Sequence, residues 1–320
     1  MPVVSGSSAR VVAEGLADEI GWQHHSLEAR RFPDSEGYVR VPAQSIEAIR
    51  SEAVVLVATT FPDQVVLETL FMLEAINDVR RGELSSLRDG LVESSDVGPG
   101  IILAIPYYGY SRQDKRFQPG EPVTARFLAR VLSRGCDGLV LLDLHAQEAV
   151  TGISIPVALT SAMPEIASHI RTTIEPDYIL SPDEGAIERA RAVAEMIGVP
   201  FSHLEKRRID AHTIEHTPKD LDVKGKVVVI VDDMISTGGT ICKASDALRR
   251  QGATAVHAAC THGLFTGGAI PRLASHVDGV HATDSLPNPR AVVSCAPALA
   301  RGVRQVLDEL AAHDQESLVA

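Results

Sequence analysis

Two adjacent carboxylates and a small polar loop stand together in the second half of the chain. The segment Val227 to Thr240 reads VVVIVDDMISTGGT, so Asp232 and Asp233 precede a loop that begins at Ser236. Glycines let the backbone approach a phosphate closely, and the N–H groups that open a helix favour an anion. The carboxylates would repel phosphate oxygens, but they suit ribose hydroxyls or a Mg²⁺-bound sugar. The local chemistry therefore predicts a site for a phosphorylated pentose, and the absence of a following Gly-Lys-Ser/Thr excludes a Walker loop.

Two segments of the first half combine charges with aromatic rings. Residues 31–36, RFPDSE, put Asp34 and Glu36 two positions apart, which on its own is more typical of a polar surface turn. Residues 107–121, YYGYSRQDKRFQPGE, bring tyrosines together with Arg112, Lys115 and Arg116. Such a connection could stack a base and bind polyphosphate, but a solvated basic loop explains it equally well.

Three more segments place polar groups after apolar stretches. Residues 142–146, LDLHA, contain His145, although a lone histidine is more often structural than a metal ligand. Residues 181–186, SPDEGA, contain Asp183 and could hold a metal or a diphosphate, or merely cap the next helix. Residues 205–208, EKRR, begin a polar stretch that extends to Lys226, either a mobile lid or a solvated charge run. No single segment is specific.

The elements that must position these residues alternate along the chain. Short apolar strands follow amphipathic helices almost throughout, which is the pattern of parallel α/β architecture. Ligands in such sheets bind off the carboxyl ends of the strands, where most of these polar segments fall. Strands are predicted at residues 53–58, 101–105, 139–142, 178–180, 227–231 and 255–259. Helices are predicted through Val66, Leu70, Leu73 and Asn77, and at residues 126–132, 188–196, 241–251 and 298–310.

Bulk composition narrows the class of protein. The chain has 320 residues, 45% of them hydrophobic, which is enough for two ordinary domains or one large one. A formal charge of −12 argues against a nucleic-acid surface. Four scattered cysteines without a CxxC pair argue against zinc or disulfide scaffolds and favour the cytoplasm. No apolar run approaches membrane-spanning length, and no signal segment is present, so no membrane association is expected.

The domain boundary is predicted near residues 155–157, where a proline follows the His145 region. Each side carries several strand–helix units, which hints at two similar halves, although no sequence repeat supports a duplication. Residues 81–100 are expected to form an extended surface loop, and residues 314–320 to fray.

Taken together and in order, these segments closely resemble one family, the ribose-phosphate diphosphokinases or phosphoribosyl diphosphate synthetases. The resemblance covers essentially the whole chain. Its motifs are SGSS at 5–8, RFPDSE at 31–36, YSRQDKRF at 110–117, DLHA at 143–146, SPDEGA at 181–186, EKRR at 205–208, DDMISTGGT at 232–240 and THGLF at 261–265. The phosphoribosyl loop alone is shared with phosphoribosyltransferases, whereas the combination with RQDKRF, DLHA and the lysine loop is specific to the synthetases. RFPDSE and STGGT look most like archaeal members.

The resemblance implies an α/β fold of two similar phosphoribosyltransferase-like domains, each a parallel sheet flanked by helices. Residues 1–157 would form the ATP side, with 298–320 packing back on it, and residues 158–297 the ribose 5-phosphate side. The implied reaction moves the diphosphoryl group of ATP to O1 of ribose 5-phosphate, with Mg²⁺, for nucleotide biosynthesis in the cytoplasm. A homo-oligomer is expected, with RFPDSE reaching a neighbouring subunit's site.

The resemblance also implies roles for individual residues. Lys206 and Arg208 match the catalytic loop cations that close over the transferring phosphates. The ATP-binding positions are Asp34, Ser35, Glu36, Arg112 and Gln113, while His145 and Asp183 match groups around the Mg²⁺–ATP site. The ribose 5-phosphate positions are Arg208, Asp232, Asp233, Ser236, Thr237, Gly238, Gly239 and Thr240. Ser236 departs from the aspartate of many bacterial and animal members, which removes a repulsive charge from the 5-phosphate loop.

Two other functions are weighed against this one. A non-catalytic regulatory homologue would show damage in the catalytic segments, and none is seen here. A phosphoribosyltransferase, which uses the product of the synthetase, would lack the tandem architecture and the RQDKRF and DLHA segments.

Overall fold

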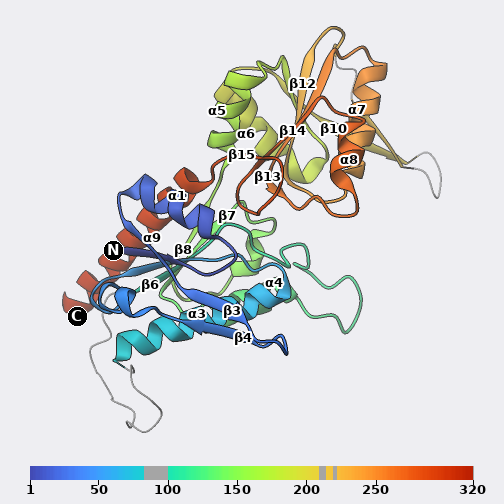
Figure 1. The fold of residues 1–320 in the computed structure, drawn as a ribbon. Helices are drawn as coiled ribbons and strands as arrows, with labels where there is room; N and C mark the ends of the chain where they lie inside the picture. The colour runs from blue at the N-terminus through green and yellow to red at the C-terminus, as the bar shows by residue number, and fades with distance from the viewer. Residues whose placement is uncertain (83–99, 209–213, 219–221, 320) are drawn as a thin grey trace. The chain divides into compact units, whose positions relative to one another are not determined.

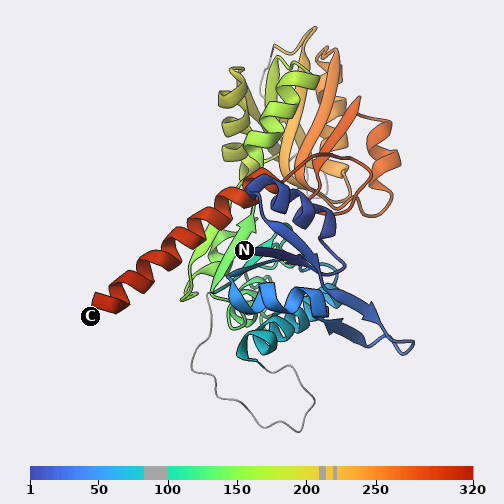
Figure 2. The same ribbon diagram turned by 60° about the vertical axis from the view of Figure 1, so that its left-hand side comes forward.

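The chain forms two compact units, seen in Figures 1 and 2. The computed structural model describes residues 1–82, 100–208, 214–218 and 222–319, and side chains outside residues 184, 204–221 and 314–320. Unit 1 comprises Met1–Thr160 and Ala296–Ala320, and unit 2 comprises Ser161–Cys295. Within the described parts of the chain, no helix has both the length and the apolar character needed to cross a bilayer.

Unit 1 is built on a six-stranded sheet in which every neighbouring pair is parallel, in the order β2-β1-β5-β6-β7-β8. Its strands are β1 (Pro2–Ser5), β2 (Gln23–Ser26), β5 (Val54–Val57), β6 (Ile101–Ile105), β7 (Gly138–Leu142) and β8 (Val157–Thr160). A separate antiparallel hairpin joins β3 (Glu28–Arg31) to β4 (Gly37–Arg40). The central strands are buried on both faces, as parallel sheets require.

Helices cover both faces of this sheet. On one face, α1 (Arg10–Ile20) and α9 (Ala296–Val319) lie side by side, so the end of the chain returns to the first unit (Figure 2). On the other face, α3 (Asp63–Arg81) and α4 (Thr124–Leu132) enclose a core that includes Leu56, Leu103 and Leu141. The remaining short elements are η1 (Ala43–Ser45), α2 (Ile46–Ser51) and η2 (Gln147–Val150).

Unit 2 is built on a seven-stranded sheet in the order β11-β10-β9-β12-β13-β14-β15, parallel except for β11. Its strands are β9 (Tyr178–Ser181), β10 (Phe201–Arg208), β11 (Ile214–Pro218), β12 (Val227–Ile235), β13 (Ala255–Gly263), β14 (Gly279–Thr283) and β15 (Ala291–Val293). Side chains alternate between the two faces of a strand. Val229 and Val231 accordingly pack under α5 (Met163–Thr173) and α6 (Ile187–Ile197). Val228 and Ile230 pack under α7 (Gly239–Arg250) and α8 (Ala269–Ala274).

The two units share one topology. In each, the parallel strands, numbered by their order along the chain, are arranged 2-1-3-4-5-6 across the sheet. In each, a two-stranded antiparallel arm follows the second strand: β3–β4 in unit 1, and the end of β10 with β11 in unit 2. The predicted class, two similar α/β domains with parallel sheets flanked by helices, is confirmed.

The structure differs from the predicted elements mainly at their ends. Strands β12 and β13 continue four residues past the predicted ends, because Asp232 and Met234 still pair with Cys260 and His262. Helix α9 runs from Ala296 to Val319, so the backbone there does not fray as predicted. In the polar stretch that begins at Glu205, residues 204–208 pair with 214–218 as antiparallel strands; its role as a mobile lid or as a solvated charge run stays a prediction. Strand β8 pairs with β7, so unit 1 extends to Thr160, beyond the seam predicted at 157. The loop predicted at 81–100 falls mainly on residues 83–99, outside the described parts.

Candidate active site

The carboxylate pair lies at the carboxyl end of β12, the strand beside β9 in the middle of the unit 2 sheet. The backbone N–H of Asp233 donates to Oδ1 of Asp232 at 2.8 Å, which orients the first carboxylate along the strand. The Asp233 residue is only 3% exposed. Burial, and then the adjacent charge of Asp233, raise the pKa of Asp232 well above its usual range. Two carboxyl groups held this close share protons readily and accept hydrogen bonds from vicinal hydroxyls.

The loop that follows is shaped by one glycine and two side-chain contacts. Gly238 has a φ of 75° and precedes the first residue of α7, so the chain turns sharply into the helix. Arg272 donates from Nη1 to the carbonyl of Thr237 at 2.5 Å, and the hydroxyls of Ser236 and Thr266 lie 3.0 Å apart. As at any helix N-terminus, the first backbone N–H groups of α7 have no acceptor within the helix, so they are suited to bind an anion. Gly239 opens α7, and Thr240, its second residue, is exposed.

The turn after β9 lies beside the carboxylate pair. Oδ1 of Asp183 accepts the N–H of Gly185 at 2.9 Å, and the hydroxyl of Ser181 donates to the carbonyl of Asp183 at 2.5 Å. The short turn η3 (Glu184–Ala186) then leads into α6. The charge of Asp183 is close enough to contribute to the raised pKa of Asp232. The structure therefore brings together three of the predicted site residues, from the ends of β9 and β12.

The predicted catalytic cations stand on the arm of unit 2. Lys206 pairs with His216, and Arg208 with Ile214, across the antiparallel β10–β11 strands. In the neighbouring strand pair, His203 of β10 is level with Ser181, the last residue of β9. Three residues of extended chain span roughly 10 Å, so Lys206 lies about that far along β10 beyond the end of β9. The side chains of Lys206 and Arg208 are outside the described part, and their catalytic role stays a prediction.

The RFPDSE segment forms the tip of the β3–β4 hairpin in unit 1. Its turn is closed by hydrogen bonds from the N–H of Phe32 to Glu36 and from the N–H of Ser35 to Phe32, both 2.9 Å. Oδ1 of Asp34 accepts the N–H of Glu36 at 3.1 Å. Alone, these contacts fit the surface-turn interpretation as well as the functional one.

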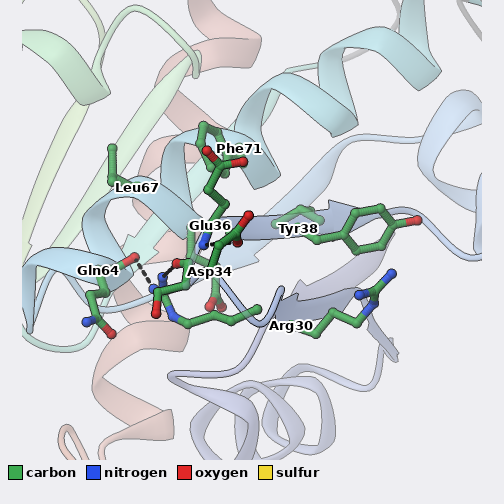
Figure 3. Close-up of a pocket in the computed structure, with 12 residues that line it drawn as sticks. Arg30, Asp34, Glu36, Tyr38, Gln64, Leu67 and Phe71 are labelled. Carbon is green, nitrogen blue, oxygen red and sulfur yellow. Dashed lines mark hydrogen bonds between the residues drawn. The ribbon is translucent and has the colours of Figure 1, made fainter.

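A cavity of about 450 Å³ opens between this hairpin and α3, as Figure 3 shows. Asp34, Ser35 and Glu36 line it from the hairpin, and Leu67 and Phe71 from the helix. On the hairpin, the Arg30 guanidinium lies 4.8 Å from the ring centre of Phe32 and 4.3 Å from that of Tyr38. The cavity thus joins carboxylates, aromatic rings and cations, the groups that can hold a planar amine-bearing base. Arg112, Gln113 and His145 do not line it.

The other predicted residues of unit 1 follow neighbouring strands β6 and β7. Gln113 accepts a hydrogen bond from the hydroxyl of Thr124 at 2.8 Å through Oε1, which ties the connection to the start of α4. Arg112 is exposed, and so is His145, which follows the buried Asp143 with its φ of 39°. Because β6 and β7 are parallel, Arg112 and His145 belong to the same edge of the sheet.

The predicted metal ligands belong to different units, His145 to unit 1 and Asp183 to unit 2. Among the residues that the structure describes, no three histidine, cysteine or acidic side chains are grouped as a metal site. Carboxylates on a strand end still suit Mg²⁺, which commonly takes one or two protein carboxylates and completes its shell with phosphates and water.

Sequence reasoning missed three arginines that contact site residues: Arg31, Arg189 and Arg272. Arg31 donates to the carbonyl oxygen of Ser35, and Nη2 of Arg189 lies 3.7 Å from Oδ2 of Asp233. Only Arg189 had a usable signal, since it follows Gly185 by four residues and so returns to the same side of a helix. The partners of Arg31 and Arg272 are backbone carbonyls, which carry no signature in a sequence.

Parallel sheets, a carboxylate pair at a strand end and a glycine-bearing loop that opens a helix define a protein of the phosphoribosyltransferase fold class. Two family models agree: the phosphoribosyl transferase domain matches residues 158–279, and the N-terminal domain of ribose phosphate pyrophosphokinase matches residues 94–135. The ribose-phosphate pyrophosphokinase of Methanopyrus kandleri is 39% identical over 96% of this chain and 99% of its own. That of Thermococcus kodakarensis is 37% identical over 85% of this chain and 90% of its own. The chain belongs to the ribose-phosphate pyrophosphokinase family.

A solved structure supports the same assignment. The phosphoribosylpyrophosphate synthetase from Mycobacterium smegmatis superimposes with a TM-score of 0.76 at 30% identity, covering 96% of this chain and 98% of that one. The predicted family is thus confirmed, including its similarity to archaeal members.

Proposed function

We propose that the protein is a ribose-phosphate diphosphokinase that serves nucleotide biosynthesis. It transfers the diphosphoryl group of ATP to O1 of ribose 5-phosphate, giving 5-phosphoribosyl 1-diphosphate and AMP. The observation that carries this proposal is family membership along almost the full length of both chains, together with the carboxylate pair and anion loop of unit 2.

Ribose 5-phosphate binds at the end of β12. Asp232 and Asp233 accept hydrogen bonds from the ribose hydroxyls, while the loop at residues 236–240 and the start of α7 hold the 5-phosphate. Arg208 contributes a further cation to this ligand. The pKa of Asp232 is raised, which suits a carboxyl group that shares the hydrogen bonds of the ribose hydroxyls with the adjacent Asp233.

ATP binds through groups of unit 1, with Mg²⁺. Asp34, Ser35 and Glu36 read the adenine, and Arg112 and Gln113 bind further along the nucleotide. By the family resemblance, Asp183 and His145 match groups that would hold the Mg²⁺–ATP complex, and the turn at residues 183–186 would receive the diphosphate of the product. Mg²⁺, when bound, neutralises phosphate charge and aligns the phosphates.

The transfer needs alignment and charge neutralisation more than covalent catalysis. The O1 hydroxyl oxygen attacks the β-phosphorus and gives up its proton to solvent, the bond from that phosphorus to the oxygen it shares with the α-phosphorus breaks, and AMP leaves with that oxygen. Lys206, a compact charge, and Arg208, a planar fork, close over the transferring group on the β10–β11 arm. Their closure excludes water, which would otherwise hydrolyse ATP.

A homo-oligomer fits this site. Among the described residues, those that line the cavity beside the RFPDSE turn come from β3, β4, their turn and α3. We assign the turn to the site of a neighbouring copy because the family resemblance implies it, and a fully active monomer would contradict this. The four cysteines are free and buried, in keeping with a cytoplasmic enzyme.

One assay tests the function. The protein is mixed with ATP, Mg²⁺ and ribose 5-phosphate, and AMP and 5-phosphoribosyl 1-diphosphate are separated and quantified. Equimolar products that require ribose 5-phosphate are expected. ADP in place of AMP, or no AMP, contradicts the proposal; diphosphate released from added 5-phosphoribosyl 1-diphosphate and a base would instead indicate a phosphoribosyltransferase.

A further inference from the structure

Arg189, on the first turn of α6, contacts two separate parts of the candidate site in unit 2. Its Nη2 atom lies 3.7 Å from Oδ2 of Asp233, and its Nη1 atom donates to the carbonyl oxygen of Gly185 at 3.4 Å. Asp233 belongs to the strand end proposed for the ribose hydroxyls, and Gly185 to the turn proposed for the diphosphate. A single planar guanidinium therefore spans the two subsites.

Burial distinguishes this pair from the surface ion pairs of the same helix. The Arg189 side chain is 20% exposed and that of Asp233 only 4%. By contrast, Arg191 is 43% exposed and pairs with Glu188, which is 79% exposed. Exposed pairs contribute little because water and salt screen them, whereas a buried pair is screened much less. Loss of the Arg189 contact is therefore expected to affect the site more than loss of the Arg191 contact.

The geometry leaves room for a ligand. Charge-assisted hydrogen bonds are usually about 2.7–2.9 Å long, so the contacts of Arg189 with Asp233 and with Gly185 are both looser than that. A carboxylate offers roughly four acceptor positions, and an ion pair on one side is compatible with hydroxyl donors on another. Arg189 thus holds the orientation of the Asp233 carboxylate without using up its capacity to accept hydrogen bonds.

We propose that Arg189 is a positioning residue that acts through Asp233. It orients the carboxylate for the hydroxyls of ribose 5-phosphate and links the carboxylate's position to the diphosphate-binding turn. The identity of the ligand rests on the proposed function; the coupling between the two residues rests on the geometry alone.

A double-mutant cycle on ligand binding tests this. Ribose 5-phosphate affinity is measured by calorimetry, without turnover, for wild type, Arg189→Gln, Asp233→Asn and the double variant. Arg189→Gln is expected to weaken binding roughly tenfold, within the range of coupling for residues in contact. Because Arg189 acts through Asp233, the double variant should bind no more weakly than Asp233→Asn alone. Arg189→Lys, which keeps the charge but not the fork, should recover part of the loss, and KM for ribose 5-phosphate should change more than kcat.

Arg191→Gln on the same helix is the matched control and should bind like wild type. Additive losses in the cycle would overturn the proposal, as would an Arg189→Gln protein with wild-type affinity. If Arg189→Gln does not fold, the same cycle is run with Arg189→Lys. If wild type binds ribose 5-phosphate but forms no AMP, the proposed function is refuted. The double-mutant cycle then still tests whether Arg189 acts through Asp233. Wild type that does not bind ribose 5-phosphate refutes both.

Discussion

The Nη1 atom of Arg31 donates a hydrogen bond to the carbonyl oxygen of Ser35 at 2.8 Å, across the tip of the β3–β4 hairpin. Ser35 has a φ of 76°, a left-handed conformation that costs a non-glycine residue about 1 kcal/mol or more. The second nitrogen of Arg31 donates to the carbonyl oxygen of Gln64 in α3 at 3.3 Å, a contact drawn in Figure 3. One arginine thus holds an unfavourable turn and joins it to the helix that forms the other wall of the cavity.

Arg31→Ala should therefore raise KM for ATP about fivefold, the effect of losing a net hydrogen-bond energy near 1 kcal/mol. KM for ribose 5-phosphate should not change, because its proposed site lies in unit 2. Steady-state kinetics with each substrate varied in turn would show this. Arg10→Ala, which removes an exposed ion pair with Glu14 on α1, is the control. Equal changes in both KM values would assign Arg31 to general stability instead.

Lys206→Ala should lower kcat by about a hundredfold or more, the usual loss when a group that stabilises developing charge is removed. Binding of ribose 5-phosphate should persist, because its carboxylates and phosphate loop are on β12 and α7. Rapid-quench measurement of AMP, together with calorimetry, separates the two effects. Lys226→Ala, at the opposite end of β12 where Lys226 pairs with Asp177 at 3.1 Å, should retain wild-type turnover. Turnover near wild type in Lys206→Ala would remove this residue from the mechanism.

Gly238→Ala should weaken ribose 5-phosphate binding by roughly tenfold or more, since a φ of 75° costs alanine about 1–2 kcal/mol. The added Cβ would also lie 2.9 Å from Cγ of Leu273, so either this side chain or the loop must shift. Gly252→Ala is the matched control, with a φ of 95° after the far end of α7. Both variants should unfold at lower temperature in calorimetric scans, but only Gly238→Ala should lose affinity. An equal loss of affinity in both would mean that the effect is global.

Most of the fold was predictable because its strands are buried on both faces. Runs such as VVVIV before Asp232 and IILAI at residues 101–105, short and rich in β-branched residues, are typical of central parallel strands, and the structure places them so. The edge strands were not predicted. β2 reads QHHS and β3 reads EARR, and neither carries an apolar pattern, because an edge or a hairpin needs backbone pairing more than side-chain burial.

The sequence suggested two similar halves, but no sequence repeat supported the shared topology of the two units. The arm with RFPDSE and the arm with EKRR both follow the second strand of their sheet, yet the two segments have no sequence similarity. Backbone pairing preserves such an arrangement while the side chains diverge. Polar residues at strand ends could be identified as site residues from the sequence. The arginines that contact the site through backbone carbonyls could not, because a backbone partner leaves no signature in the sequence.

Acidification should destabilise unit 2 through His281. Burial, followed by the charges of His169, His257 and Arg290, lowers the pKa of His281 from 6.5 to about 4. Its Nδ1 atom is 2.9 Å from Nε2 of His169, so protonation places a charge in a contact between imidazoles. A folded pKa below the unfolded one means that the unfolded state takes up the proton first. The contribution is intact above about pH 6.5 and is lost as pH falls toward 4.

His281→Gln should therefore flatten the decline of the unfolding midpoint between pH 6.5 and 4, measured by thermal scans at closely spaced pH values. His313→Gln, at an exposed position of α9, serves as the control and should decline like wild type. Parallel curves for wild type and His281→Gln would show that other groups control the acid sensitivity.

Mg²⁺ should bind tightly only together with ATP. The described residues contain no group of three acidic, histidine or cysteine side chains that could hold a metal, and Mg²⁺ at phosphoryl-transfer sites is held largely by substrate phosphates. EDTA should therefore abolish AMP formation, and added Mg²⁺ should restore it, while the unfolding midpoint of the free protein stays unchanged by either. Calorimetric titration of Mg²⁺ should show strong binding when ATP is present and weak binding without it. Asp183→Asn should weaken only the binding seen with ATP. Tight binding of Mg²⁺ to the free protein would instead require a complete protein-made site.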